Sequence, residues 1–174
     1  MLAVSMLASC ASAPAKPIRM VIAPFEAQHS DFRGEPVLSS RDTENCLQDR
    51  LAASGRFIIL ERRNLDSVIQ AQRRGDAKAG SLAGADWVAY GTLEGTLQGL
   101  FDAPGSRCTA VVIVQLRVVR VDDGVIIYSN THRGTAEGAP SSAEGMFLKE
   151  IGLLNEANRI AVSKLADDLI GLAR

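Results

Sequence analysis

The stretch Thr109–Arg133, "TAVVIVQLRVVRVDDGVIIYSNTHR", constrains the fold most strongly. Apolar residues alternate with Gln115 and Arg117, which is typical of a strand with one buried face. Asp123-Gly124 then predicts a tight hairpin turn, after which the chain returns as a second strand. An isolated hairpin is only marginally stable in water, so this one must pair with further strands or pack against a helix.

The C-terminal segment, roughly residues 142–172, supplies such a helix. Its apolar residues follow a helical stripe that consists of Phe147, Ile151, Leu154, Ala161, Leu165, Leu169 and Leu172. The sequence therefore predicts a long amphipathic C-terminal helix that covers the sheet.

The remaining segments alternate between strand-like and helix-like patterns. The predicted strands are Ile18–Phe25, Arg56–Leu60 and Trp87–Leu97, and the predicted helices run from about Ser39 to Gly55 and from about Asn64 to Gly75. Within the third of these strands, Gly91 and Gly95 suggest a bulge or bend. This order predicts an α/β fold in which helices cover an open mixed β-sheet of about five strands. We expect one domain, residues 17–174.

Residues 1–16 read as the end of a lipoprotein signal followed by a short tether. Leu7-Ala8-Ser9-Cys10 resembles a bacterial lipobox, in which Cys10 is lipidated and becomes the first mature residue. The competing interpretation is a buried strand or short helix, because residues 2–7 are largely apolar. A signal peptide requires a Lys or Arg before its apolar run, and none precedes the run here. An alternative is therefore that Met1 is an internal methionine.

The expected location follows from the lipobox. A lipid on Cys10 would hold the protein to a membrane without spanning it. Ala11 stands where an Asp would favour inner-membrane retention, so we expect the periplasmic side of the bacterial outer membrane. No apolar run reaches the ~18 residues of a membrane-spanning helix.

No set of residues points to catalysis, a metal or a cofactor. The two histidines, His29 and His132, lie in different elements and are expected at the surface, and neither has a cysteine or carboxylate at metal-ligand spacing. Phosphate-loop, dinucleotide and nucleophile-elbow patterns are missing. A net charge of -1 gives no broad basic field for nucleic acid. The sequence therefore favours a binding protein that is not an enzyme.

Cys46 and Cys108 are candidates for a disulfide. An exported protein meets an oxidising compartment, which permits such a bridge. The alternative is two independent, semi-buried thiols, because sequence alone does not set the distance between their Cα atoms.

Three stretches resemble the curli-secretion lipoprotein family, CsgG. They are "SGRFIILERRNLDSVI", "AGADWVAYGTL" and "VQLRVVRVDDGVIIYSNTHRGTA", and the resemblance covers roughly Ile18–Arg174. It implies a periplasmic α/β domain, a fold that penicillin-binding-protein activator lipoproteins share. The family forms rings, so a homo-oligomer is one expectation, although the composition is equally compatible with a monomer.

The chain departs from the curli channel at two connections. In that channel each subunit inserts two long hairpins into the outer membrane. At the corresponding places this chain has only "QGLFDAPGSRC" and "TAEGAPSSAEG", which are too short and too polar for two crossings. The resemblance therefore implies the periplasmic module without its pore.

Three functions are compatible with these observations. The first is an anchored periplasmic module that binds envelope proteins during biogenesis or secretion. The second is a regulator of a peptidoglycan synthase (a penicillin-binding protein), although only about seven residues separate Cys10 from Ile18, a reach of ~25 Å. The third is an enzyme, which would need a site that the motifs do not provide.

Overall fold

The computed structural model describes residues 16–28, 38–60, 84–99, 107–138 and 146–173. The elements are β1 (Ile18–Ile22), β2 (Glu26–Gln28), α1 (Ser40–Ala53), β3 (Phe57–Ile59), β4 (Trp87–Gly99), β5 (Cys108–Arg120), β6 (Ile126–Gly138) and α3 (Met146–Leu172). The α/β class, the mixed sheet and the long C-terminal helix are as predicted. The predicted helix from Asn64 to Gly75 lies outside the described residues, as do the two short connections at 100–106 and 139–145.

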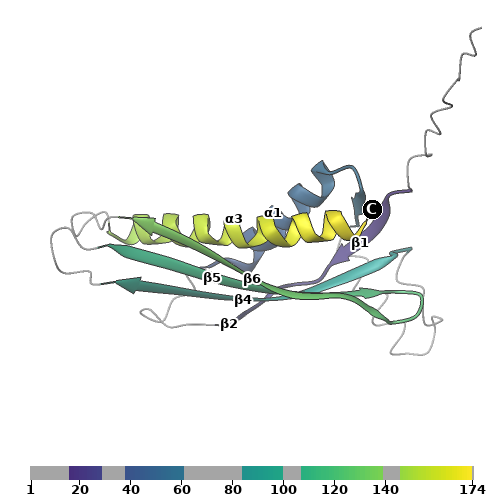
Figure 1. The fold of residues 1–174 in the computed structure, drawn as a ribbon, viewed down its shortest axis with the longest axis horizontal. Helices are drawn as coiled ribbons and strands as arrows, with labels where there is room; N and C mark the ends of the chain where they lie inside the picture. Colours follow the sequence, from purple (N-terminus) through teal and green to yellow (C-terminus); the bar gives the residue numbers. More distant parts are fainter. Residues whose placement is uncertain (1–15, 29–37, 61–83, 100–106, 139–145, 174) are drawn as a thin grey trace, which may run out of the picture.

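The sheet has six strands, in the order β3-β1-β4-β5-β6, with β2 also paired to β4 (Figure 1). β1 runs parallel to β3 and β4, and β2 runs parallel to β4, whereas the pairings of β4 with β5 and of β5 with β6 are antiparallel. The predicted strand Ile18–Phe25 is shorter than expected because the chain leaves β4 after Ile22 and returns to it as β2. Between the two, Phe25 is buried in the core.

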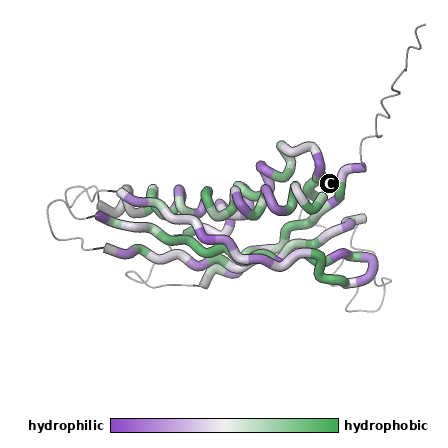
Figure 2. Tube along the Cα trace, viewed as in Figure 1, coloured by the Kyte–Doolittle hydropathy of each residue, from purple (hydrophilic) through white to green (hydrophobic). Residues whose placement is uncertain are grey.

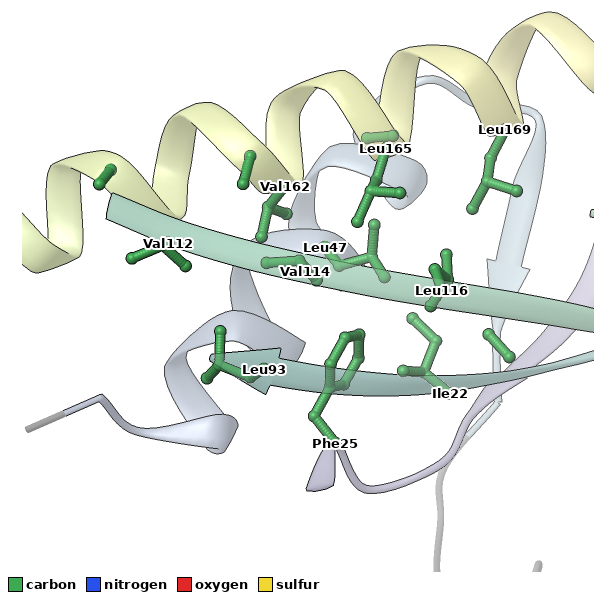
Figure 3. Close-up of a cluster of buried hydrophobic side chains, with 14 of the residues drawn as sticks. Ile22, Phe25, Leu47, Leu93, Val112, Val114, Leu116, Val162, Leu165 and Leu169 are labelled. Atoms are coloured by element: carbon green, nitrogen blue, oxygen red, sulfur yellow. The ribbon is translucent and has the colours of Figure 1, made fainter. Parts of the chain in front are cut away.

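Both described helices lie on the same face of this sheet (Figure 1). The inward residues of β4 and β5 alternate along each strand and meet the apolar stripe of α3. Figure 3 shows Leu47 of α1, Leu116 of β5 and Leu165 of α3 pointing into one apolar layer, and all three are fully buried. Burial of side chains of this size, at about 1.5–3 kcal/mol each, drives the assembly of the layers.

Helix α1 begins after a capping serine, Ser39, and ends before a glycine, Gly55. The Ser39 hydroxyl accepts a hydrogen bond from the Asp42 N–H at 3.3 Å, which caps the first turn. Gly55 follows the helix with φ +67°, a left-handed conformation that glycine adopts without strain. The predicted start near Ser39 and stop at Gly55 are confirmed.

The bulge that was one prediction for Gly91 and Gly95 does not occur. The register of β4 against β5 is continuous through both glycines, and the bulge lies instead between Val118 and Val119 in the pairing of β5 with β6. The glycines make room: a Cβ on Gly91 would overlap the Phe25 ring, and one on Gly95 would overlap Leu38. Glycine in a strand can mark a close approach instead of a bulge.

Candidate functional site

On the face of the sheet opposite α1 and α3, a second buried apolar cluster contains Val21, Ala23, Ala85 and Val88, and the rest of this face along β4, β5 and β6 is largely polar. We call it the open face, and define it by successive rows across β4, β5 and β6: Tyr90–Arg117–Ser129, Thr92–Gln115–Thr131, Glu94–Ile113–Arg133, Thr96–Val111–Thr135 and Gln98–Thr109–Glu137. These rows follow from the pairing register and from the two-residue alternation of strands. Apart from Val111, which is buried, the residues of the open face whose burial is described are exposed or half-buried.

A cleft of about 570 Å³ hollows the open face near its Tyr90 end. Its floor includes Tyr90, Thr92, Gln115 and Arg117. Glu26, at the start of β2, lies in register with Thr92 and lines the cleft from the neighbouring strand. The volume falls within the range of small-molecule sites.

The cleft combines an exposed aromatic ring with exposed apolar side chains. Tyr90 is 48% exposed and lies directly opposite Arg117 in the β4–β5 ladder. Ile126, which is 52% exposed, lines the cleft from the first residue of β6, in the hydrophobic stretch that follows the hydrophilic turn of the hairpin (Figure 2). Exposed large apolar residues that gather at a concave site are typical of interaction surfaces.

Sequence reasoning missed this site. It identified the alternation of Gln115 and Arg117, which places them on the polar face of β5, but it did not set the register of β4 against β5. The cross-strand pairing of Tyr90 with Arg117 is therefore visible only in the structure.

A second polar cluster joins the edge strand β6 to α3. Asp168 Oδ2 accepts hydrogen bonds from the Tyr128 hydroxyl at 2.9 Å and from Asn130 Nδ2 at 3.2 Å, and His132 Nε2 lies 2.8 Å from it. The hydrogen bonds from His132 and Tyr128 lower the pKa of Asp168. Burial, and then the bond to Asp168, raise the pKa of Tyr128. His132, expected at the surface, is half-buried.

The other candidate residues are distributed as follows. Cys10 and His29 lie outside the described residues. Cys46 is half-buried on α1 and Cys108 is buried at the start of β5, and no disulfide joins them in this structure. Burial raises the pKa of the Cys46 thiol. Both alternatives, a bridge and two independent thiols, stay predictions.

Two further observations concern only the described ranges. They hold no group of three or more His, Cys, Asp or Glu side chains placed to share a metal ion. Neither described helix is long and apolar enough to cross a membrane.

Solved structures share this fold at low sequence identity. The hypothetical protein CT253 from Chlamydia trachomatis is 12% identical, with a TM-score of 0.61 over 91% of this chain and 98% of that one. Protein XCC0632 from Xanthomonas campestris is 12% identical, with a TM-score of 0.51 over 91% and 86%. PelC from Paraburkholderia phytofirmans, described as a dodecamer, is 16% identical, with a TM-score of 0.50 over 88% and 89%.

Among curated protein sequences no match is found. The family model for the curli production assembly/transport component CsgG, in contrast, matches residues 3–171. This match spans nearly the whole chain, including every strand and helix described above except Leu172, the last residue of α3. The chain therefore belongs to the CsgG family.

Proposed function

We propose that this protein is a lipid-anchored module on the periplasmic side of the bacterial outer membrane that binds other envelope proteins and has no catalytic activity. The observation that carries the proposal is the CsgG family match over residues 3–171. The open face adds support, because it is a broad polar surface with an exposed Tyr and an exposed Arg at a cleft. Tyr and Arg are enriched among the residues that dominate protein–protein binding energies.

The anchor is tested by Cys10→Ser in the native host. Without the thiol no thioether to lipid forms, so the variant should leave the membrane fraction and appear in the soluble periplasm. Ser9→Ala is the matched control, because it keeps a small residue beside Cys10 and should remain bound to the membrane. A Cys10→Ser protein that still sediments with membranes would overturn the lipid anchor.

The binding role is tested by site-specific photo-crosslinking in living cells. A photoreactive residue at Gln115, on the open face, should give discrete adducts with an envelope protein. The same residue at Arg159, on the exposed surface of α3, is the control and should give few. Equal crosslinking from both positions would contradict a role for the open face.

We also propose that the protein forms a homo-oligomer, since the dodecameric PelC shares its fold. Size-exclusion chromatography with light scattering on the Cys10→Ser chain measures the assembly directly. A defined oligomer supports this proposal, whereas a monomer at all concentrations contradicts it.

A further inference from the structure

We propose that the cleft at Tyr90 and Arg117 binds a short extended peptide segment of a partner protein, one that places an acidic residue on Arg117 and a basic residue at Glu26. This inference rests on the proposed binding function and deepens it, because it names the site and the chemistry of the bound segment.

The first step is the state of the two charges. In the part of the chain that the structure describes, neither Arg117 nor Glu26 takes part in an ion pair or a side-chain hydrogen bond, although both are exposed and both line the cleft. Nearby charges behave differently: Arg120 is paired with Asp123 at 2.7 Å and with Asp122 at 3.4 Å. The cleft thus presents one cation and one anion whose charges remain available to a ligand.

The second step is what the two charges select. A ligand that covers the cleft must replace the water on both of them, and an uncompensated charge is costly to desolvate. A neutral molecule would compensate neither. A polyanion such as nucleic acid or a lipid phosphate cluster would pair with Arg117 but would be repelled by Glu26. A peptide that carries side chains of both signs complements the pair.

The third step is the floor between the charges. Thr92 and Gln115 lie opposite each other in the β4–β5 register and present a hydroxyl and an amide. The backbone groups of a central strand are used by its neighbours, so a bound segment must be held by side chains such as these. Gln115 offers both a donor and an acceptor to a peptide backbone.

The fourth step is the apolar contact. Tyr90 and Ile126 are each about half exposed, and both line the cleft. An apolar residue next to the acidic one would cover them. Arg117 is suited to the acidic residue because a guanidinium binds a carboxylate with two parallel hydrogen bonds. The preferred segment is therefore apolar and acidic at one end and basic at the other.

The test is selection of a random displayed heptapeptide library on the immobilised Cys10→Ser chain, followed by the same selection on its Arg117→Glu form. Peptides from the first should share an acidic residue beside an apolar one, and those from the second should exchange the acidic residue for a basic one. Tyr90→Ala should weaken binding of the selected peptides by about tenfold or more. Arg159→Glu, on α3, is the control and should change neither the motif nor the affinity.

Two outcomes would overturn the proposal. One is a set of selected peptides with no charge preference, or with a preference that Arg117→Glu leaves unchanged. The other is self-association of the chain that Tyr90→Ala and Arg117→Glu both abolish, because the occupant would then be a second copy. If envelope partners still crosslink to Gln115 in either case, the binding function stands and only the peptide inference fails. Circular dichroism and thermal unfolding verify that each variant is folded.

Discussion

His132 Nε2 lies 2.8 Å from Asp168 Oδ2, which joins the edge strand β6 to the last turns of α3 across 36 residues of sequence. The same oxygen also accepts hydrogen bonds from Tyr128 and Asn130. Asn130 Nδ2 approaches His132 Nε2 at 3.3 Å as well, and a nitrogen that donates to Asp168 does not accept from Asn130. The shorter contact assigns the Nε2 proton to the bond with Asp168.

This cluster predicts a specific loss of stability in acid. The hydrogen bonds from His132 and Tyr128 hold the pKa of Asp168 below its usual value near 3.8. A carboxyl with a lowered pKa in the folded state stabilises the fold fully above its unfolded pKa. This contribution is lost as the pH falls through the lower folded pKa. Wild-type protein should therefore lose part of its free energy of unfolding as the pH falls below about 4.

Asp168→Asn removes the ionisable carboxylate. We expect it to lower the free energy of unfolding at pH 7 by about 1 kcal/mol, a modest value because Asp168 is 40% exposed. The difference from wild type should shrink as the pH falls below about 4. Asp167→Asn is the control, since the partner of Asp167 is Arg50 at 3.8 Å and both side chains are exposed. Urea unfolding at several pH values measures both, and a difference that stays constant with pH would exclude this role for Asp168.

A second prediction concerns the closest approach of α3 to the sheet. A Cβ added at Gly134 of β6 would overlap the backbone carbonyl of Ala157 and approach the backbone of Ala161. Backbone cannot rotate away as a side chain can, so Gly134→Ala must push α3 off β6. We expect a loss of about 1–3 kcal/mol, the usual range for overpacking, measured as a fall in the thermal midpoint.

Gly152→Ala provides the matched control for this substitution. Gly152 lies in α3 with no heavy atom within 4 Å of its added Cβ. Alanine there should raise stability by about 1 kcal/mol, because glycine is a poor helix former. If both substitutions shifted the midpoint in the same direction, close contact at Gly134 would not be the cause.

Features that depend on neighbouring residues were predictable from the sequence, whereas features that depend on residues far away in the chain were not. The hairpin turn at Asp123-Gly124, the cap at Ser39 and the long C-terminal helix depend on neighbouring residues, and all three were predictable. Gly91 was misinterpreted because what fills the space above it is Phe25, which lies far away in the sequence. The strand β6 also runs five residues beyond the predicted end at Arg133, to Gly138. These largely polar residues adopt a strand because they pair with the start of β5, where Cys108 lies opposite Gly138.

The candidate site depends on the same distant relationships. The alternation of residues predicted that Arg117 lies on a polar strand face. It did not predict that Tyr90 of β4 lies opposite Arg117, because the register of the two strands does not follow from the sequence. His132 was expected at the surface, and only the packing of α3 on β6 brings Asp168 to it. Pairwise register and helix docking are the physical information that a single sequence lacks.

A third prediction concerns the two described cysteines. Cys46 lies close enough to Arg159 of α3 for that guanidinium to influence its pKa, whereas Cys108 is in register with Gly138, which approaches Leu153. Arg159 and Leu153 are six positions apart in α3, which is about 9 Å along the helix axis, so the two cysteines lie near different turns of this helix. We therefore expect separate thiols. Mass spectrometry after alkylation of the unfolded, unreduced Cys10→Ser chain should find both modified, and an unmodified pair would establish the disulfide instead.

The last prediction concerns the free edge of the sheet, where β6 pairs only with β5 among the described strands. Two backbone groups near its centre are bonded to side chains: Lys164 Nζ donates to the Arg133 carbonyl at 2.9 Å, and the Thr131 N–H donates to Asn130 Oδ1 at 2.9 Å. Alternate residues of an edge strand turn their backbone groups outward, and such groups can pair with another chain. The lysine and the asparagine thus occupy positions that a foreign strand would need.

Lys164→Ala together with Asn130→Ala should expose this edge. We expect the double variant to self-associate more strongly than wild type as its concentration rises, measured by sedimentation velocity, because an unpaired edge templates strand addition. Lys164→Arg, which keeps a donor that can reach the carbonyl, is the control and should sediment as wild type does. Unchanged sedimentation of a double variant that is still folded would mean that α3 itself, rather than these two side chains, keeps the edge closed.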